Sequence, residues 1–509
     1  MTRRVLPSCA AVAALILTSL PRQLAGQEPY PGFDAYVVKS MQALKVPGAA
    51  VAIVRNDSVI YRKGYGTLAK GSQTPVNEQT LFEIGSSSKA FTATLVAMMV
   101  SDGKMRYDDL VSKYLPDFKL SDPVASAQVT IRDGLAHRSG IGRGELVWLD
   151  AGVSREEILH RVRFLKPESQ FRSRWSYQNM MYLAAGEAAG KAAGTTWDDL
   201  VQRRLFTPLG MTSSFPTYRG VTTSNLATAH AMDHDTVEKK SRFDAENIAP
   251  AGAILSTATD MAQWLRFQLN DGVVDGKRLV SSLALRETHT PQMLVGAAGG
   301  PGANDQVLFN TYGMGWIVQD YRHELAWQHG GNTPGMTTAV GMLPEKKFGV
   351  VVLTNMDHTP LADALQRYLF DRHLGAPVRD YAGEASARAI AQRRPDTTAA
   401  RVGVTPPLPL SAYVGTFADS LYGEATVSLQ NGRLEFTRGS AHGPLEYWNA
   451  NNFRWLSTAA IPAVSAYIKF EVSPDDKVTG VYYGLAPDIS LLGRKAASSA
   501  RSPRAGGAP

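Results

Sequence analysis

The sequence predicts an α+β catalytic region followed by a small domain of short strands. Three observations support this order. Strand-like runs lie near both ends of residues 30–375 with helix-like stretches between them, a Pro-rich segment follows over 376–409, and short strands recur over 410–494. The chain has 509 residues, enough for two to four domains, and its 44% hydrophobic content excludes a wholly disordered protein.

The first 26 residues have the pattern of an export signal. Arg3 and Arg4 precede 12 mainly apolar residues at 9–20, and the small residues Ala25 and Gly26 offer a cleavage site. Twelve residues are fewer than the ~20 of a membrane-spanning helix, and an uncleaved anchor is the alternative. We therefore expect an exported protein, periplasmic or secreted, with no stable membrane span after signal removal.

The mature chain has neither thiol chemistry nor a strong charge bias. Cys9 is the only cysteine, so cleavage would leave no disulfide, cysteine nucleophile or thiolate metal site. The formal charge is +7, and it falls to +4 without the first 26 residues, which hold three arginines and no acidic residue. So small an excess is not the footprint of a nucleic-acid-binding protein, and we expect no nucleic-acid partner.

Two hairpins can be predicted in the first domain. Residues 46–66 form strand-like runs around the turn residues Asn56 and Asp57. Residues 337–355 repeat the pattern around a polar turn at 344–347. We therefore expect strands at both ends of this domain.

Two helices are predicted between these hairpins. The sequence KAFTATLVAMMV after Ser86 is apolar around most of its circumference, which is typical of a buried helix. Another helix should follow Thr257, which forms a capping-box-like pair with Asp260. The mixture of strands and helices indicates an α+β arrangement.

The C-terminal part has a different composition. Residues 376–409 read as a helix that passes into a Pro-rich linker. The strand-like sequence starts at Tyr413, and Asn431-Gly432 is a strong hairpin signal. These short strands predict a small β-barrel or sandwich. Residues 495–509 lack the apolar content to fold and are expected to be a loose tail.

No metal site or cofactor is implied. HELAW at 323–327 begins like a zinc-protease helix, but Trp327 stands where the second histidine is needed. His230 and His234 have helical ligand spacing without a carboxylate-rich helix around them. We interpret these as ordinary histidines.

Three short motifs can together form a nucleophilic site. Each is weak alone, because the same patterns recur at 101–104, 447–449 and 373–375 in other contexts. The three motifs are Ser86-Ser-Ser-Lys89, Tyr177-Gln-Asn179 and His329-Gly-Gly331.

Ser86 has the strongest physical case. A serine at a helix start lies near unpaired N–H groups and the positive end of the helix dipole. Lys89 lies one turn along the same face, where apolar neighbours can lower its pKa by desolvation and let it act as a base. The alternative is that Ser86 only caps the helix and Lys89 is a surface charge. Tyr177 and His329, taken alone, are equally compatible with structural roles.

The surrounding text decides between these alternatives, because it resembles the three signatures of the serine β-lactamase-like superfamily. That group includes class C β-lactamases, DD-peptidases, D-aminopeptidases and related esterases. The resemblance spans about residues 30–375 and implies a transpeptidase-like domain with an antiparallel sheet flanked by helices. Residues 410–494 resemble the lipocalin-like β-barrel of a D-amino-acid-processing branch. The segments that carry the resemblance are FEIGSSSKAFTA, WSYQNMMYLAAGEAAG, WQHGGNTPGM, LAHRSGI, AGAILSTATDMAQWL and YGMGW.

The resemblance implies a role for each motif residue. Ser86 would be acylated, Lys89 would take or relay its proton, and Tyr177 would assist as base and then protonate the leaving group. Which of Lys89 and Tyr177 is the base stays open. Asn179 would fix Lys89 and bond the substrate amide. The residues expected to contact substrate are Asn179, His329, Gly330, Gly331 and Asn332, with the N–H groups of Ser86 and Asn332 forming the oxyanion hole.

His329 is a departure from many β-lactamases, which carry lysine at this position. Histidine has an unperturbed pKa of ~6.5, so a protonated His329 would supply a charge for a substrate carboxylate only at low pH. Peptidase and esterase members also use histidine here. The departure therefore changes the expected substrate and leaves catalysis intact.

The sequence thus predicts an exported serine hydrolase that forms an acyl-enzyme, most plausibly on small D-amino-acid amides or short peptides. A class C-like β-lactamase or a carboxylesterase is the alternative on the same machinery. The alternative from another class is an inactive protein that binds wall peptides, against which the intact Ser86, Lys89 and Tyr177 set argues. The oligomeric state stays open.

Overall fold

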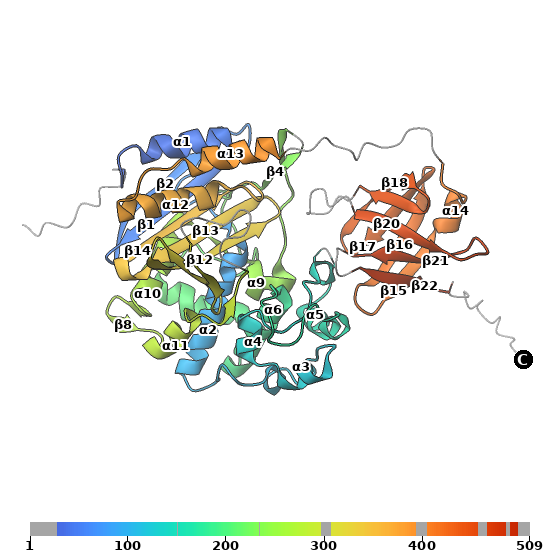
Figure 1. Cartoon of the computed structure of the whole chain (residues 1–509), viewed down its shortest axis with the longest axis horizontal. Helices are drawn as coiled ribbons and strands as arrows, with labels where there is room; N and C mark the ends of the chain where they lie inside the picture. The colour runs from blue at the N-terminus through green and yellow to red at the C-terminus, as the bar shows by residue number, and fades with distance from the viewer. Residues whose placement is uncertain are drawn as a thin grey trace, which may run out of the picture.

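The structure is a computed structural model of the chain (Figure 1). The expected signal segment with Cys9, His234, and the tail beyond position 496 lie outside the residues that it describes. The described residues are 28–149, 151–233, 235–296, 307–392, 405–456, 466–484 and 489–496.

An eight-stranded antiparallel sheet forms the centre of the first domain. Its N-terminal hairpin pairs with its C-terminal hairpin, with Ala49 opposite Thr354. The predicted hairpins at 46–66 and 337–355 are confirmed. In sheet order the strands are β2 (Ser58–Gly66), β1 (Gly48–Arg55), β14 (Phe348–Thr354), β13 (Met336–Leu343), β12 (Glu324–Thr333), β11 (Ile317–Tyr321), β10 (Asn310–Tyr312) and β9 (Met293–Leu294).

Helices cover both faces of this sheet (Figure 1). Successive residues of β1 enter different cores, because side chains alternate across a strand. Ala49, Val51 and Ile53 join the core under α1 (Phe33–Ala43) and α12 (Leu361–Leu374). Their neighbours on β1 join the core that contains α2 (Ser88–Ser101) and α10 (Ala258–Leu269). Burial on both faces explains why β1 is an almost continuous apolar run.

The two predicted helices are confirmed. Helix α2 is buried from Ser88 to Met99, and the hydroxyl of Thr257 caps α10 by accepting from the Asp260 N–H. The other helices of this domain are α3 (Pro123–Gln128), α4 (Ile131–Leu135), α5 (Arg155–Arg161), α6 (Asn179–Ala193), α7 (Trp197–Val201), α8 (Thr207–Leu209), α9 (Ala249–Gly252) and α11 (Ser282–Thr288). Three two-stranded pairs complete it: β3 (Phe82–Glu83) with β6 (Leu255–Ser256), β4 (His230–Asp233) with β5 (Thr236–Lys239), and β7 (Val273–Val274) with β8 (Lys277–Arg278).

The C-terminal domain is a closed antiparallel barrel of eight strands, which confirms the barrel expected from the resemblance. The predicted hairpin at Asn431-Gly432 joins β16 to β17, with both residues at positive φ. Aromatic side chains such as Phe436 and Phe470 are buried in the barrel. A short helix, α14 (Leu410–Tyr413), precedes the strands β15 (Gly415–Asp419), β16 (Gly423–Gln430), β17 (Arg433–Arg438), β18 (Ala441–Asn449), β19 (Asn452–Trp455), β20 (Ala466–Val472), β21 (Val478–Tyr483) and β22 (Ser490–Arg494).

The segment predicted as a linker at 376–409 begins with a packed helix. Helix α13 (Tyr381–Ala391) lies against α1 and α12. The Tyr381 hydroxyl donates to the buried Asp371 at 2.5 Å, and Ala382 is fully buried. The first domain therefore extends through α13, beyond the predicted boundary at 375, because the apolar side of this helix completes the core under α12.

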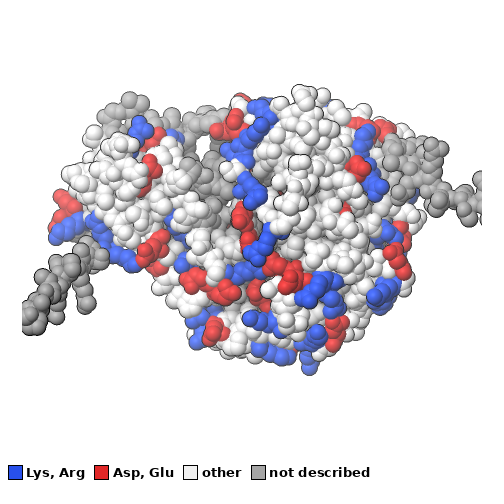
Figure 2. Space-filling view, turned by 180° about the vertical axis from the view of Figure 1, so that it is seen from behind, with Lys and Arg blue, Asp and Glu red and all other residues white. Residues whose placement is uncertain are grey.

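Charged side chains of both signs are interspersed over the face of the molecule in Figure 2. Many charged side chains of the described residues form ion pairs, as Arg155 does with Asp198 at 2.6 Å. None of the helices in the described residues combines the length and apolar character needed to cross a bilayer.

His289 is a buried imidazole that stacks on Trp327, with a ring-centroid distance of 3.7 Å. Neither of its ring nitrogens has a hydrogen-bond partner in the described structure. Burial lowers the pKa of His289 to about 3. The folded protein therefore holds this ring neutral at pH values where an unfolded histidine is charged.

We predict that His289→Phe makes the protein less sensitive to acid. An unfolded histidine titrates near pH ~6.5, so the stability that depends on neutral His289 is present above this pH and is lost as the pH falls towards 3. Phenylalanine keeps the stacked ring without the titration. Urea unfolding at pH 7.5 and 5.0 should show the variant losing about 2 kcal/mol less than the parent over this interval. If the parent and the variant lose the same free energy of unfolding between these pH values, the burial of a neutral His289 ring is contradicted.

Candidate active site

Ser86 lies in a tight turn that leads from β3 into α2. Gly85 starts this turn at φ 51°, a left-handed conformation that glycine adopts without strain. Ser86 keeps part of its surface exposed, whereas the residues on either side of it are buried. The turn thus presents one hydroxyl to solvent at the N-terminal end of a buried helix.

The turn packs directly on strand β12. A Cβ atom at Gly331 would lie 1.9 Å from the Ile84 carbonyl oxygen, and one at Gly85 would lie 2.7 Å from the Asn332 nitrogen. Both positions therefore need glycine, because the backbone of the turn lies directly against the backbone of β12. Gly331 was expected to make room for substrate, but it makes room for the turn that carries Ser86.

Lys89 is fully buried one helical turn after Ser86. Its Nζ donates to Ser86 Oγ at 3.0 Å and to the Ala251 carbonyl at 2.8 Å, and it lies 4.8 Å from the centre of the Tyr177 ring. Burial, assisted by the charge of Arg143, lowers the pKa of Lys89 well below its usual value, while Glu145 opposes the shift. A lysine in this position favours the neutral amine.

Tyr177 precedes α6 and faces Ser86. Burial raises the pKa of Tyr177, and a hydrogen bond with Ser86 and the charge of Arg143 act in the opposite direction. The ring packs on His137 at a centroid distance of 4.3 Å. His137 Nδ1 also accepts a hydrogen bond from the N–H of Gln178 at 3.0 Å. This bond fixes the backbone beside Tyr177. The phenol therefore keeps its proton.

Asn179 begins α6 and contacts a residue that the sequence analysis did not single out. Its Nδ2 lies 3.3 Å from each carboxylate oxygen of Glu145. The expected bond from Asn179 to Lys89 is wrong for the described structure, where Lys89 bonds to Ser86 and Ala251. Asn179 still lines the cavity in front of Ser86.

His329 does not present a charge to the cavity. Its side chain is 5% exposed, and its Nε2 lies 3.0 Å from the Tyr312 hydroxyl, which is in turn 3.4 Å from the Tyr182 hydroxyl. Burial and the charge of Lys89 lower the pKa of His329 to about 3. A protonated His329 was expected to supply a charge only at low pH, and burial moves that protonation to a still lower pH.

A cavity of about 700 Å³ opens in front of Ser86. Alternation along β12 explains which predicted residues reach it, since Gly330 and Asn332 are exposed while His329 and Gly331 face inward. Lys89 lies behind the wall, in contact with Ser86. The predicted residues that line the cavity are Ser86, Tyr177, Asn179, Gly330 and Asn332.

The further residues that line this cavity include Arg143, Glu145, Trp148 and Phe243. Arg143 and Glu145 form an ion pair at 2.7 Å, and the Arg143 guanidinium lies 5.2 Å from the centre of the Tyr177 ring. Trp148 and Phe243 add apolar walls. The sequence signal for the first three was the segment RGELVW directly after LAHRSGI, although nothing in it specifies which charge faces the site.

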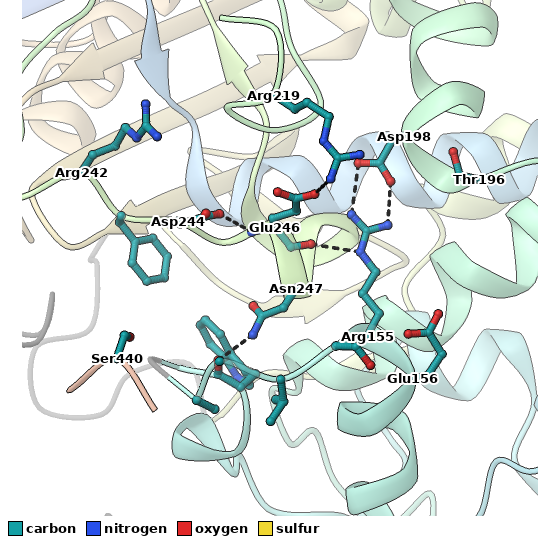
Figure 3. Close-up of a pocket in the computed structure, with 16 residues that line it drawn as sticks. Arg155, Glu156, Thr196, Asp198, Arg219, Arg242, Asp244, Glu246, Asn247 and Ser440 are labelled. Carbon is teal, nitrogen blue, oxygen red and sulfur yellow. Dashed lines mark hydrogen bonds and ion pairs between the residues drawn. The ribbon is translucent and has the colours of Figure 1, made fainter. Parts of the chain in front are cut away.

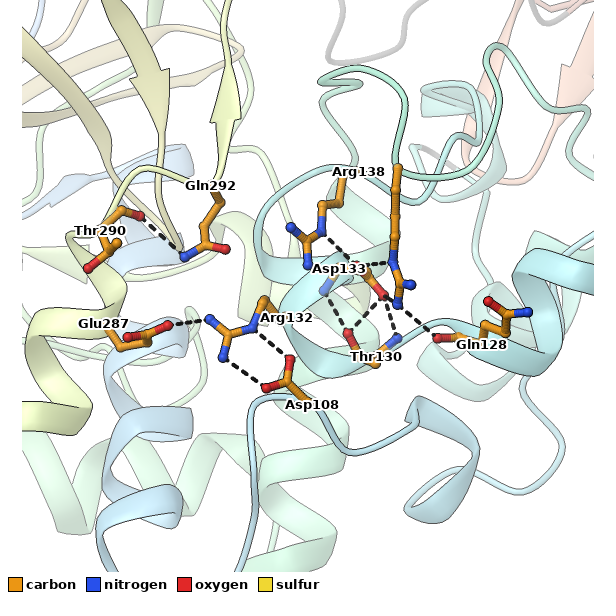
Figure 4. Close-up of polar contacts among 10 residues, drawn as sticks. Asp108, Gln128, Thr130, Arg132, Asp133, Arg138, Glu287, Thr290 and Gln292 are labelled. Atoms are coloured by element: carbon orange, nitrogen blue, oxygen red, sulfur yellow. Dashed lines mark hydrogen bonds and ion pairs between the residues drawn. The ribbon is translucent and has the colours of Figure 1, made fainter.

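The segment before Arg143 is anchored by the buried carboxylate of Asp133 (Figure 4). Asp133 accepts from Arg138 at 2.6 Å, from Arg172 at 2.7 Å and from the N–H of Thr130 at 2.9 Å. Two arginines and a backbone donor stabilise its charge, and they lower its pKa against the effect of burial. This network fixes the path of the chain into the cavity-lining segment 143–149.

The rejected metal motifs have structural roles in this fold. His323 precedes β12 and Glu324 begins it, so HELAW is not a helix. His230 lies in β4, where its Nε2 accepts from the Lys70 N–H at 3.0 Å. Within the described residues, no group of three or more His, Cys, Asp or Glu side chains is arranged to hold a metal ion.

Comparison with known families now identifies the catalytic domain. Residues 33–373 match the family described as Beta-lactamase. The chain belongs to the beta-lactamase family. Residues 399–495, which include the barrel, match a domain of unknown function, DUF3471. The superfamily inferred from the three motifs is thereby confirmed.

Individual relatives are distant. Unguisins hydrolase ungD of Aspergillus violaceofuscus is 28% identical, over 90% of this chain and 88% of that protein. Penicillin-binding protein 4 of Amycolatopsis lactamdurans is 29% identical, over 61% of this chain and 81% of that protein. The chain is therefore similar to the first of these relatives over 90% of its own length.

Two solved structures share the fold. The octameric penicillin-binding protein homologue from Pyrococcus abyssi has a TM-score of 0.60 and 22% identity, over 91% of this chain and 98% of its own. A class C beta-lactamase in complex with cefoxitin has a TM-score of 0.55 and 22% identity, over 67% of this chain and 97% of its own. These likenesses establish the fold expected from the sequence.

We predict that alanine is tolerated at Gly330 but not at Gly331. A Cβ at Gly331 overlaps the Ile84 carbonyl, whereas a Cβ at Gly330 comes no closer than 3.5 Å to the Thr338 oxygen. Gly331→Ala should lower the free energy of unfolding by about 1–3 kcal/mol or more, as overpacking does. Gly330→Ala is the matched control and should unfold like the parent. Urea denaturation of both checks this, and equal stability of the two variants would contradict the described packing.

Proposed function

We propose that this protein is an exported serine hydrolase that forms an acyl-enzyme on small D-amino-acid amides or short peptides. The observation that carries the proposal is the buried Lys89 amine, 3.0 Å from the exposed hydroxyl of Ser86. A neutral amine beside a serine can remove the serine proton and create a nucleophile. The relatives named as a hydrolase and a penicillin-binding protein support the same chemistry.

In the first step, Ser86 Oγ attacks the substrate carbonyl carbon while its proton passes to Lys89 Nζ. Lys89 is the base in this proposal, because its pKa is lowered while that of Tyr177 is raised. The carbonyl oxygen becomes an oxyanion held by the N–H groups of Ser86 and Asn332. The proposal thus assigns to Lys89 the role of base, which the sequence left open.

In the second step, the tetrahedral intermediate collapses and the leaving amine departs. Tyr177 gives its phenolic proton to the leaving nitrogen and receives the proton held on Lys89. Water then attacks the Ser86 ester, its proton returns through the same groups, and the acid product and free serine are released. Each proton taken from a nucleophile is thus returned to a leaving group.

The cavity offers charges of both signs, because the Arg143 guanidinium and the Glu145 carboxylate line it as an ion pair, and the choice of an amine-bearing substrate rests on Glu145. The neutral His329 provides no cation for a carboxylate. The carboxylate of Glu145 lines the cavity wall beside Asn179 and can accept from a substrate ammonium group. Amides and peptides with a free D-amino terminus carry such a group, whereas a penicillin carries a carboxylate.

Mass spectrometry distinguishes the candidate activities. The protein is incubated with a D-amino-acid amide, a penicillin and a p-nitrophenyl ester, and both the Ser86 adduct and its turnover are measured. Fast turnover of the amide supports the proposal. Preferential turnover of penicillin or ester would favour a β-lactamase or a carboxylesterase, and a complex without an adduct would favour an inactive wall-peptide-binding protein.

We predict that Ser86→Ala lowers turnover of every substrate by about 10⁴ to 10⁶ without changing the fold. The substitution removes the attacking hydroxyl and keeps the backbone N–H at this position, which holds the oxyanion. Steady-state kinetics and the absence of an adduct check the effect, and an unchanged melting temperature controls for folding. Near-normal activity of the variant would exclude Ser86 as the nucleophile.

We predict opposite pH shifts for Glu145→Gln and Arg143→Gln. Lys89 acts as base only when unprotonated, so kcat/KM falls as the pH drops through its pKa. Glu145 raises this pKa and Arg143 lowers it. The acidic limb of the profile should therefore move to lower pH in Glu145→Gln and to higher pH in Arg143→Gln. Limbs that stay in place, or move in the same direction, would argue against Lys89 as the base.

Export rests on the N-terminal segment at 1–26. Expression of the full chain should give a mature protein in the periplasm or the medium, with a new N-terminus near Gly26. N-terminal sequencing of the purified protein checks this. An intact N-terminus on a protein that stays with the membrane would indicate the uncleaved anchor.

A further inference from the structure

A second large cavity lies between the two domains. Its volume is about 790 Å³. The catalytic domain supplies most of its lining, and Ser440 of the barrel closes one side (Figure 3). Ser440 belongs to the two-residue turn between β17 and β18.

This cavity adjoins the one that contains Ser86. Trp148 and Phe243 line both cavities, and their rings meet edge to face at a centroid distance of 6.3 Å. Both side chains are largely buried, with 8% and 7% of their surface exposed. The aromatic pair is therefore the wall that the two cavities share.

The lining of the second cavity is polar, and four of its charged side chains form two ion pairs. Arg155 donates to Asp198 at 2.6 Å and to the Glu246 carbonyl at 3.0 Å, and Arg219 pairs with the Glu246 carboxylate. Asn247 donates to the Trp148 carbonyl at 2.8 Å. Fixed polar groups around two aromatic walls suit a peptide, which alternates amide groups with side chains, better than a single small ion.

The barrel turn is held against the segment that lines the active site. Arg438, just before the turn, is 3% exposed and donates to the Tyr422 carbonyl at 3.0 Å within the barrel and to the Leu149 carbonyl at 3.5 Å across the domain boundary. A Cβ at Gly152 would lie 3.9 Å from Gly439. The barrel thus contacts the same segment that contributes Trp148 and Leu149 to the Ser86 cavity.

We infer that the cavity between the domains is an extended substrate site, which binds the part of a peptide substrate distant from its scissile bond. The barrel forms one wall of this site through the Gly439-Ser440 turn. The inference rests on the proposed acyl-enzyme function and adds to it that peptides of several residues are better substrates than single amino-acid amides.

The test compares two substrates cleaved after an N-terminal D-alanine, D-alanine amide and a tetrapeptide that begins with D-alanine. Ser440→Trp fills the cavity from the barrel side, and Val153→Trp fills it from the catalytic side. Gln430→Trp places the same ring on an exposed strand end of the barrel and is the matched control. Melting temperatures report on folding.

The parent should turn over the tetrapeptide with at least tenfold higher kcat/KM than the single-residue substrate. Ser440→Trp and Val153→Trp should abolish this preference, mainly by raising KM, while they change kcat/KM for the single-residue substrate less than twofold. Gln430→Trp should behave like the parent. A preference that survives both cavity variants, or an equal loss for both substrates in folded variants, would overturn the inference. A parent that forms no acyl-enzyme with either substrate would instead refute the proposed function.

Discussion

The close approach of two backbone segments, at Ile84 to Ser86 and at Gly331 to Asn332, determines the rest of the site. It brings the nucleophile turn onto β12 and lets the amide groups of Ser86 and Asn332 lie on neighbouring elements. It is attainable only because Gly331 has no side chain, since a Cβ there would overlap the Ile84 carbonyl. From this contact α2 runs into the core, and Lys89 is carried with it into a fully buried position.

The burial of Lys89 then sets the chemistry. A charged amine would be poorly solvated there, and the groups within hydrogen-bond reach are Ser86 Oγ and one backbone carbonyl. The nearest carboxylate, Glu145, is already paired with Arg143 and therefore stabilises the ammonium form only in part. In the proposed mechanism, Lys89 is therefore a base without a dedicated partner base, and the protonated Tyr177 is the donor for the leaving group.

Much of this could be predicted from the sequence because the relevant signals are local. Each of three elements is determined by contacts within a few residues: the helix after Ser86 by its apolar sequence, α10 by its cap at Thr257, and one hairpin by the Asn431-Gly432 turn. The three motifs also identified the side chains around the nucleophile. The domain boundary was harder to predict. The place of α13 in the core depends on its contacts with α1 and α12, and α1 is distant in sequence.

The parts that could not be predicted depend on which face of an element a side chain occupies and on which segment lies opposite. His329 was expected to gain its charge below a pKa of ~6.5, yet its position on β12 turns it towards Tyr312, and burial lowers its pKa to about 3. Glu145 and Arg143 have no motif, and they matter because the Asp133 network directs their segment across the site. The same segment continues to Gly152, where it meets the barrel. This segment therefore links the charges that act on Lys89 to the position of the barrel. A change in those charges or in the position of the barrel is expected to affect substrate selection.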